Sequence, residues 1–434
     1  MDIKGIARST VAILVIAIII IAGIGAYLAT RPPAGKQPGE IWIAIVTDVG
    51  GRGDMSFNDM GFRGCDLAKE QGIVDKVTEV ISTTAADYLP NLRMLAATGD
   101  YDLIIPIGFL LQGATYTVAK EYPQQNFACI DFTADSGYPD FTPMGTPGAL
   151  GVLFHDEQSG ALEGVLAGLI AAQYSKPHVG AVFGMEIPPV IAYEIGFRYG
   201  LYWSLSWYEN KFGTAAPGIS ASAIKLLPGG IGGYTGVFDD PALGKSYAVA
   251  QLAYDLATCW GAAGATGLGV FTAVEEYHTE RNIPTGQPPF ILGVDANQDW
   301  MKPGLVIGSG MKRIDQAVVN LSRLVRENKF KATVENLNAL LVLGMKEGAS
   351  GISNLELLDD AIQFGIAHEQ LTGESVLPGT PDQIKAAVKA MRDAQPAWVW
   401  EGVSEFENKI LDGTIVVPRV TDSATAGTYR TLWA

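Results

Sequence analysis

The chain has 434 residues, of which 48% are hydrophobic and 18% charged, and its formal net charge is −16. This length suffices for two domains of ordinary size, and the composition predicts a packed rather than a disordered chain. Nucleic-acid-binding proteins usually carry a basic footprint, so the acidic balance argues against that class of partner. The three cysteines and four histidines show no metal-binding or redox spacing. We therefore expect neither a metal site nor a cofactor.

The N-terminus contains an uncharged apolar run of 19 residues, Val11–Ala29. A membrane-spanning helix needs about 20 such residues, whereas the apolar part of a signal peptide has roughly 7–15. We predict that residues 1–30 anchor the chain in the cell membrane, with the remainder on the extracytoplasmic side. The alternative is a signal segment cleaved near Gly25. Residues 31–40 contain several prolines and glycines and are expected to form an extended linker.

The next segment, IWIAIVTDVGGRGDMSFNDMGFRG from Ile41 to Gly64, indicates a strand, a glycine-rich turn and the start of a helix. Its first residues are apolar and mostly β-branched, which is typical of a parallel strand covered on both faces. Asp48 follows the strand, and Phe57 and Asn58 stand where the helix would begin. Ligands of open α/β sheets bind at the carboxyl ends of the strands. These three side chains are therefore candidates for binding a small molecule.

Beyond this segment, short apolar runs alternate with amphipathic stretches, which predicts βαβ units and parallel sheets. Near the middle of the chain we expect a helix over Pro241–Trp260 and a strand over Gly267–Phe271. Residues 419–434 are expected to form a short polar tail.

No motif in the sequence indicates catalysis. Gly244-Lys245-Ser246 is similar to the end of a phosphate-binding loop, but that motif requires glycine at the position of Asp239. No serine lies in a nucleophile elbow, and no second histidine follows His368-Glu369 at the spacing of a zinc protease. We therefore expect that the protein is not an enzyme.

Several segments resemble, in the same order, the basic membrane protein (BMP) family. These are substrate-binding lipoproteins of ABC transporters, and purine-nucleoside receptors are the best-understood type. The family opens with TDxGxxxDxSFNxxxxxG, and this chain has TDVGGRGDMSFNDMGFRG. Further similar segments are GFLLQGATYTVAKEYPQQNFACIDF, VGAVFGMEIPPVIAYEIGFRYG, GVFDDPALGKSYAVAQ, GAAGATGLGVF, ILGVDANQ and SGMKRIDQAV. One departure is that the family has a lipid-accepting cysteine after the N-terminal apolar segment, whereas the first cysteine here is Cys65.

The resemblance implies the type I periplasmic-binding-protein fold, with two doubly wound α/β lobes joined by three crossovers. On this basis the first lobe comprises residues 41–147 and 292–328. The second lobe comprises residues 148–291 and 330–418. The chain would cross between the lobes near Gly151, Asp295 and Phe330. Residues 352–382 are longer than the resemblance implies for this segment, and we expect them to form a surface insertion.

The resemblance also implies a ligand site between the lobes. On the first lobe, Phe57 would stack on a base, Asp48 and Asn58 would hold polar groups of the ligand, and Asp131 would bind the edge of the base. A carboxylate accepts the N–H donors of a purine well, and charge-assisted hydrogen bonds are the stronger class. The alternative for Asp131 is a strand-end residue that caps the following turn.

On the second lobe, Tyr193 or Phe238 would close the other side of the stacking arrangement, because every base offers an aromatic face. The alternative for Tyr193 is a place in the packed stripe of its helix beside Phe197. Gly264 and Gly267 would let backbone N–H groups approach the ligand.

At the crossover, Asp295 and Lys312 would bind the hydroxyls of ribose. The alternative is that these two residues form a hinge salt bridge without touching a ligand.

These expectations together describe the extracytoplasmic receptor of an ABC importer, which binds a nucleoside, with a purine favoured, between two closing lobes. Its partners would be an ABC permease and its ATPase, and the membrane through the N-terminal segment. Two alternatives stay open. One is a receptor for a sugar or another small solute, and the other is a membrane-tethered ligand sensor.

Overall fold

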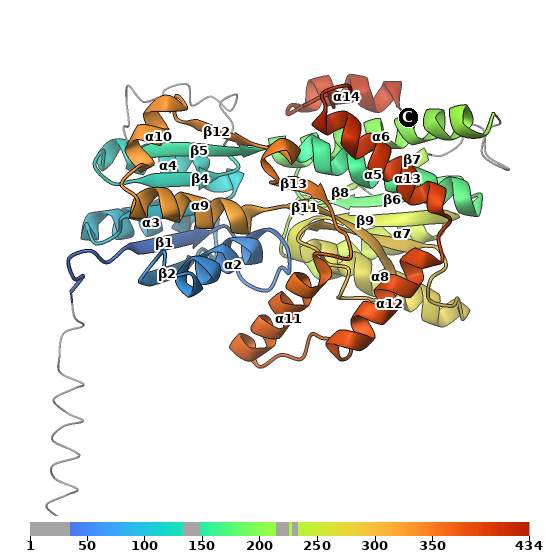
Figure 1. Cartoon of the computed structure of the whole chain (residues 1–434), viewed down its shortest axis with the longest axis horizontal. Coiled ribbons are helices and arrows are strands. Elements are labelled where there is room, and N and C mark those ends of the chain that lie inside the picture. The colour runs from blue at the N-terminus through green and yellow to red at the C-terminus, as the bar shows by residue number, and fades with distance from the viewer. Residues whose placement is uncertain (1–34, 133–147, 214–224, 228–232, 434) are drawn as a thin grey trace, which may run out of the picture. The chain divides into compact units, whose positions relative to one another are not determined.

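The computed structural model describes residues 35–132, 148–213, 225–227 and 233–433. From Ile41 onward the chain forms one compact unit, which contains two α/β lobes built on separate sheets (Figure 1). The predicted α/β class and two-lobe arrangement are confirmed. The predicted anchor, residues 1–30, lies outside the described residues. Within the described ranges, none of the helices has both the length and the apolar character that crossing a membrane requires.

The first lobe is built on a six-stranded sheet with the order β12-β5-β4-β3-β1-β2. All neighbouring strands in it pair in parallel. Its strands are β1 (Trp42–Thr47), β2 (Lys76–Ile81), β3 (Leu103–Ile107), β4 (Phe127–Ile130), β5 (Ala149–Phe154) and β12 (Leu340–Leu343).

Helices cover both faces of this sheet. Ile43 and Ile45 of β1 pack in the same core as α2 and α9, whereas Ala44 and Val46 pack in the core of α3 and α4. Successive side chains of a strand point to opposite faces, so a sheet covered on both sides requires the uninterrupted apolar run seen in β1. These helices are α2 (Phe57–Glu70), α9 (Ile314–Arg326), α3 (Tyr88–Thr98) and α4 (Gln112–Glu121).

The second lobe is built on a sheet with the order β13-β11-β10-β9-β6-β7, and β8 pairs beside β6. β13 runs antiparallel to β11, and the other pairings are parallel. Its strands are β6 (His178–Phe183), β7 (Lys225–Leu227), β8 (Gly233–Tyr234), β9 (Leu256–Ala262), β10 (Phe290–Asp295), β11 (Val306–Lys312) and β13 (Ser350–Ile352).

This second sheet is also covered on both faces. Helices α5, α6 and α13 share a core with Val179 and Ala181 of β6, and helices α7 and α8 share another core with Val182. The helices of this lobe are α5 (Asp156–Tyr174), α6 (Pro188–Phe212), α7 (Pro241–Leu252), α8 (Leu268–Arg281), α11 (Leu358–Thr372), α12 (Pro381–Asp393), α13 (Ala397–Leu411) and α14 (Ser423–Leu432). The remaining helical segments are α10 (Phe330–Asn336) beside α9 and the short η1 (Ala85–Asp87), η2 (Phe109–Leu111), η3 (Gly264–Gly267) and η4 (Met345–Glu347).

Along the described residues the chain passes between the two sheets three times, after β5, after β11 and between β12 and β13. These passages lie near His155, Arg313 and Met345, and each is later in the chain than the sequence-based expectation. Residues 149–154 and 340–343 therefore belong to the first sheet, and residues 292–312 to the second, which corrects the expected lobe boundaries. The physical reason is that short, mostly apolar runs form strands in both sheets, so the residues of a strand do not show which sheet it joins. Its sheet is decided by the strand with which it pairs.

Two local expectations also differ from the structure. The helix expected over Pro241–Trp260 ends at Leu252, and Leu256–Ala262 forms the central strand β9. Gly267–Phe271 is not a strand, because Leu268 begins α8. A fully buried strand and a buried helix segment cannot be distinguished by periodicity alone. Residues 352–382 contain α11, and the C-terminal tail contains α14.

Candidate ligand-binding site

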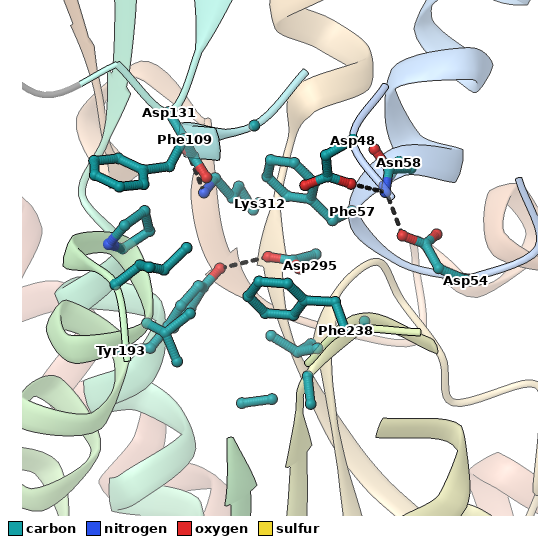
Figure 2. Close-up of a pocket in the computed structure, with 18 residues that line it drawn as sticks. Asp48, Asp54, Phe57, Asn58, Phe109, Asp131, Tyr193, Phe238, Asp295 and Lys312 are labelled. Atoms are coloured by element: carbon teal, nitrogen blue, oxygen red, sulfur yellow. Dashed lines mark hydrogen bonds and ion pairs between the residues drawn. The ribbon is translucent and has the colours of Figure 1, made fainter. Parts of the chain in front are cut away.

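A cavity lies where the two lobes meet, at the carboxyl ends of strands from both sheets (Figure 2). Its empty volume, which includes space open to solvent, is about 560 Å³. Nine of the ten residues predicted from the sequence line it, namely Asp48, Phe57, Asn58, Asp131, Tyr193, Phe238, Gly264, Asp295 and Lys312.

The first-lobe wall is organised around Asp48, directly after β1. Its Oδ1 accepts hydrogen bonds from Asn58 Nδ2 at 2.9 Å and from the backbone N–H of Gly50 at 3.1 Å. Burial raises the pKa of Asp48 to about 6, although both hydrogen bonds oppose the shift. Asn58 Oδ1 is buried and has no hydrogen-bond partner among the described residues. The wall therefore offers a free acceptor next to a carboxyl group that can hold a proton.

The start of α2 places Phe57 and Asn58 at this wall because Asp54 caps the helix. Its carboxylate accepts from the backbone N–H groups of Ser56 at 2.9 Å, Asn58 at 2.8 Å and Asp59 at 3.1 Å. A side-chain acceptor at a helix N-terminus satisfies N–H groups that otherwise lack partners. Asp54 also lines the cavity. Sequence reasoning did not select it, although an aspartate shortly before a helix start is a recognisable capping signal.

Lys312, at the end of β11, lies buried between carboxylates from both lobes. Its Nζ is 2.5 Å from Asp131 Oδ1 and 2.9 Å from Asp156 Oδ1. Burial opposes its charge, but Asp131, Asp156 and Asp295 outweigh that effect and raise the pKa of Lys312. Burial also raises the pKa of Asp156 to about 7 despite the nearby ammonium. Lys312 is therefore a permanent cation that compensates a surplus of carboxyl groups.

Asp295, at the end of β10, is held by one residue from each lobe. Tyr193 Oη donates to its Oδ1 at 2.8 Å, and Ser56 Oγ donates to its Oδ2 at 3.3 Å. The ring of Tyr193 packs edge-on against Trp260 at 5.8 Å. Tyr193 thus combines the two roles considered from the sequence, since it lines the cavity and packs in the core. The hinge ion pair considered for Asp295 and Lys312 is not the one observed, because Lys312 pairs with Asp131 and Asp156.

Aromatic rings from both lobes face the cavity (Figure 2). Phe57 comes from the first lobe, and its ring centroid lies 5.0 Å from Lys312 Nζ. Phe238 comes from the second lobe and lies against the backbone of Gly184, where an added Cβ would come within 2.1 Å of the ring. Phe109, which the sequence analysis did not select, is a third ring in the lining.

Two of the cavity's aspartates adopt left-handed backbone conformations, with φ of +63° at both Asp131 and Asp295. Asp131 directly follows β4 of the first lobe, and Asp295 is the last residue of β10 of the second lobe. Non-glycine residues in this region are uncommon and gather at functional sites, where the surrounding structure holds them in place. The two lobes therefore present a carboxylate to the cavity in the same strained manner.

The sequence matches the model of the Bmp family, described as PnrA-like ABC transporter substrate-binding proteins, over residues 41–202 and 232–373. The protein belongs to the Bmp family.

Among its relatives is an uncharacterized lipoprotein of Pyrococcus horikoshii, which is 32% identical over 388 residues, or 89% of this chain and 86% of the relative. The ABC transporter nucleoside-binding protein BmpA of Lactococcus lactis is 26% identical over 338 residues, or 74% of this chain and 86% of the relative. A solved ABC transporter solute-binding protein from Aeropyrum pernix K1 is 32% identical. It superposes with a TM-score of 0.74 over 89% of this chain and 96% of that chain.

Membership in the Bmp family confirms the resemblance inferred from the sequence motifs and makes this chain an ABC transporter substrate-binding protein. One predicted residue, Gly267, does not line the cavity. A Cβ on Gly267 would lie 2.4 Å from the carbonyl oxygen of Gly261, so this glycine allows η3 to approach β9. Other residues in the lining were not predicted, namely Asp54, Gly108, Phe109, Ile187, Pro189, Val190, Ala262, Ala263 and Val294. Most of these are apolar or glycine, and nothing in the local sequence separates them from core residues.

Proposed function

We propose that this Bmp-family protein is the extracytoplasmic receptor of an ABC importer and binds a nucleoside, preferably a purine nucleoside, in the cavity between its lobes. The observation that carries the proposal is the pairing of aromatic rings with polar acceptors in one cavity. Phe57 and Phe238 come from opposite lobes, and Asn58 Oδ1 is an unoccupied acceptor beside them. Base–aromatic stacking needs the rings, and the N–H groups of a purine edge need the acceptors.

The charge of the cavity supports an uncharged ligand. Asp48, Asp54, Asp131 and Asp295 line it, and Lys312 is the cation in the same lining. Ribose hydroxyls donate well to carboxylates, whereas a phosphate group would be placed among like charges at a cost of several kcal/mol. A nucleoside therefore fits these surroundings better than a nucleotide.

The family and the named relatives support the transport role. The chain is an ABC transporter substrate-binding protein, and the relative from Lactococcus lactis is named as a nucleoside-binding protein. In this proposal the ligand draws the lobes together through a hinge motion at the crossovers, and the closed form binds the permease.

We also propose that the uncharged segment Val11–Ala29 tethers the protein to the membrane. Its length of 19 residues supports this proposal, and relatives such as the one from Pyrococcus horikoshii are named lipoproteins. Full-length protein should stay in the membrane fraction after a carbonate wash, and a native chain whose intact mass lacks this segment would contradict the tether.

The ligand is tested by mass spectrometry of small molecules released when the natively purified protein is denatured. Calorimetry with inosine, guanosine, adenosine, cytidine and ribose then ranks the classes. We expect a purine nucleoside to bind most tightly, and binding of ribose without any nucleoside would overturn the proposal in favour of a sugar receptor.

Phe57→Ala tests the stacking interaction. The loss of base stacking, worth roughly 1–3 kcal/mol, should weaken nucleoside binding by about one to two orders of magnitude in calorimetry. Tyr277→Ala is a matched control, because Tyr277 is also a partly buried aromatic residue and also lies near a cation, Arg281 at 3.9 Å, but does not line the cavity. Equal affinities for the wild type and Phe57→Ala would show that Phe57 contributes only packing.

A further inference from the structure

The C-terminal helix α14 packs onto α6, the helix whose first turns carry Pro189, Val190 and Tyr193 of the cavity lining. The apolar part of this contact includes Ile191 and Ile195 of α6 with Val420 and Ala426. Other contacts come from aromatic rings, where Trp433 lies edge-on to Tyr199 at 5.6 Å. A segment at the very end of the chain therefore supports a wall of the ligand cavity. It lies beyond residue 373, where the match to the family model ends.

Arg430 of α14 is the polar centre of this contact. Its Nε lies 3.0 and 2.9 Å from the two carboxylate oxygens of Glu194, and its Nη1 donates to Glu186 Oε1 at 2.9 Å. Its Nη2 donates to Tyr234 Oη at 3.3 Å, and Tyr234 Oη itself donates to Glu194 Oε2 at 2.8 Å. One guanidinium thus joins three separate segments of the second lobe.

Each of these three segments leads directly to the cavity. Glu186 precedes Ile187, Glu194 follows Tyr193, and Tyr234 lies four residues before Phe238. Tyr193 donates to Asp295, and Phe238 supplies the second-lobe ring. By binding all three partners, Arg430 therefore holds three parts of the second lobe in one arrangement. These parts are the loop before α6, the first turns of α6 and the segment that leads from Tyr234 to Phe238.

The burial of Glu194 makes this arrangement sensitive to Arg430. The side chain of Glu194 is 1% exposed and also pairs with Arg198 at 2.9 Å. Although burial acts in the opposite direction, Arg430 and Arg198 keep the pKa of Glu194 below its usual value. Without Arg430, Glu194 keeps Arg198 and Tyr234 as partners but loses the hydrogen bonds from the Arg430 guanidinium to both of its carboxylate oxygens. A buried carboxylate that loses charged donors is costly, so the surrounding segments rearrange or take up water.

We propose that Arg430 is a positioning residue for ligand binding, which holds the second-lobe wall of the cavity in register through Glu186, Glu194 and Tyr234. The affinity readout of this proposal rests on the proposed nucleoside-binding function. The second readout, hydrogen exchange of the cavity wall in the unliganded protein, does not depend on the proposed function.

The experiment compares Arg430→Met, which keeps the length of the side chain, with Arg430→Lys, which keeps its charge. Arg281→Met is the control, since Arg281 is an exposed arginine on α8 of the same lobe and contacts Glu280 and Tyr277 of its own helix. Hydrogen exchange of the full, unliganded chain is measured over residues 186–195 and 234–238. Affinity for the purine nucleoside that binds the wild type most tightly is measured by calorimetry.

We expect Arg430→Met to speed exchange in both segments at least tenfold and to weaken nucleoside binding about tenfold. Arg430→Lys should restore part of both effects, and Arg281→Met should match the wild type.

Unchanged exchange in the two segments of Arg430→Met would overturn the positioning role. A lower unfolding midpoint with unchanged affinity would also overturn it, because that pattern indicates general stabilisation only. If the wild type binds no nucleoside, the proposed function fails, and the exchange measurement still decides the role of Arg430.

Discussion

At the scale of single residues, the cavity gathers carboxyl groups whose burial works against their charge. Burial raises the pKa of Asp48 to about 6 and that of Asp156 to about 7. The unfolded chain releases these protons near the ordinary value of 3.8, so between that pH and the raised pKa the native state binds more protons. The free energy of unfolding must therefore fall as the pH rises through this window.

Asp48→Asn tests this coupling, since an amide at this position keeps an acceptor for Asn58 and Gly50 but carries no charge. The difference between the ordinary pKa of 3.8 and the raised value of about 6 corresponds to roughly 3 kcal/mol. We expect the unliganded variant to be more stable than the wild type at pH 8 by up to this amount, with the difference vanishing near pH 4. Urea unfolding from pH 4 to pH 8 measures it, with the exposed Asp100→Asn as control. A variant that is no more stable at pH 8 would contradict the assignment.

The close pairing of Asp131 with Lys312 also changes how the site is divided. The sequence suggested that Asp131 binds the base while Lys312 binds the ribose. Because the two groups are 2.5 Å apart, removing Lys312 takes this cation away from the buried Asp131, and removing Asp131 leaves Lys312 paired with Asp156 alone. Substitutions at these positions should therefore affect base and ribose recognition together.

At the scale of secondary-structure elements, the cavity wall depends on the close packing of α5 against α6. Glycines repeat along α5 at positions 160, 164 and 168 and along α6 at positions 196 and 200. A Cβ on Gly164 would lie 2.0 Å from the carbonyl oxygen of Phe197, and one on Gly200 would lie 1.9 Å from that of Ala161. The two helices therefore pack backbone against backbone, which places Tyr193 of α6 beside the cavity.

Gly164→Ala should lower the unfolding midpoint, although alanine is usually favoured over glycine within a helix by about 1 kcal/mol. The added methyl group would force the two helices apart, and overpacking typically costs 1–3 kcal/mol. Gly427→Ala is the matched control, because Gly427 lies in α14 with no atom within 4 Å of an added Cβ. Thermal unfolding of both variants compares the effects, and a midpoint for Gly164→Ala at or above that of the wild type would disprove the close packing.

At the scale of the whole molecule, polar contacts join the two lobes around the cavity. Lys312 pairs with Asp131, and Ser56 Oγ donates to Asp295. Farther from the cavity, Arg63 of α2 in the first lobe pairs with Asp360 of α11 in the second. In a receptor that closes on its ligand, contacts of this kind favour the closed arrangement and separate when the lobes open.

Arg63→Met should therefore weaken nucleoside binding although Arg63 does not line the cavity. An ion pair with one exposed partner is worth about 0.2–1 kcal/mol, so we expect a loss of roughly 1.5- to 5-fold. The unliganded variant should also show a larger radius of gyration in small-angle X-ray scattering. Arg93→Met is the control, because the Arg93–Glu121 pair lies within the first lobe. An unchanged affinity and radius would show that the Arg63–Asp360 contact does not influence closure.

Local sequence patterns were sufficient to predict the first elements along the chain that contribute residues to the cavity. The apolar β-branched run before Asp48, the glycines after it and the Phe57-Asn58 pair predicted the strand, the turn and the helix start, and the structure contains all three. These features depend on side-chain type and spacing within about 20 residues, and such information is present in the sequence itself. Together with the family motifs, it also selected ten residues, of which nine line the cavity.

Tertiary structure alone decided the lobe to which each strand belongs, the pairing of Lys312 and the role of the C-terminal helix. β5 and β12 join the first sheet through their neighbours, and no property of their own residues distinguishes them from strands of the second sheet. Arg430 reaches Glu194 across 236 residues of sequence. Contacts at such separations depend on how complete lobes pack, because burial and charge compensation act between surfaces that meet only after the chain has folded.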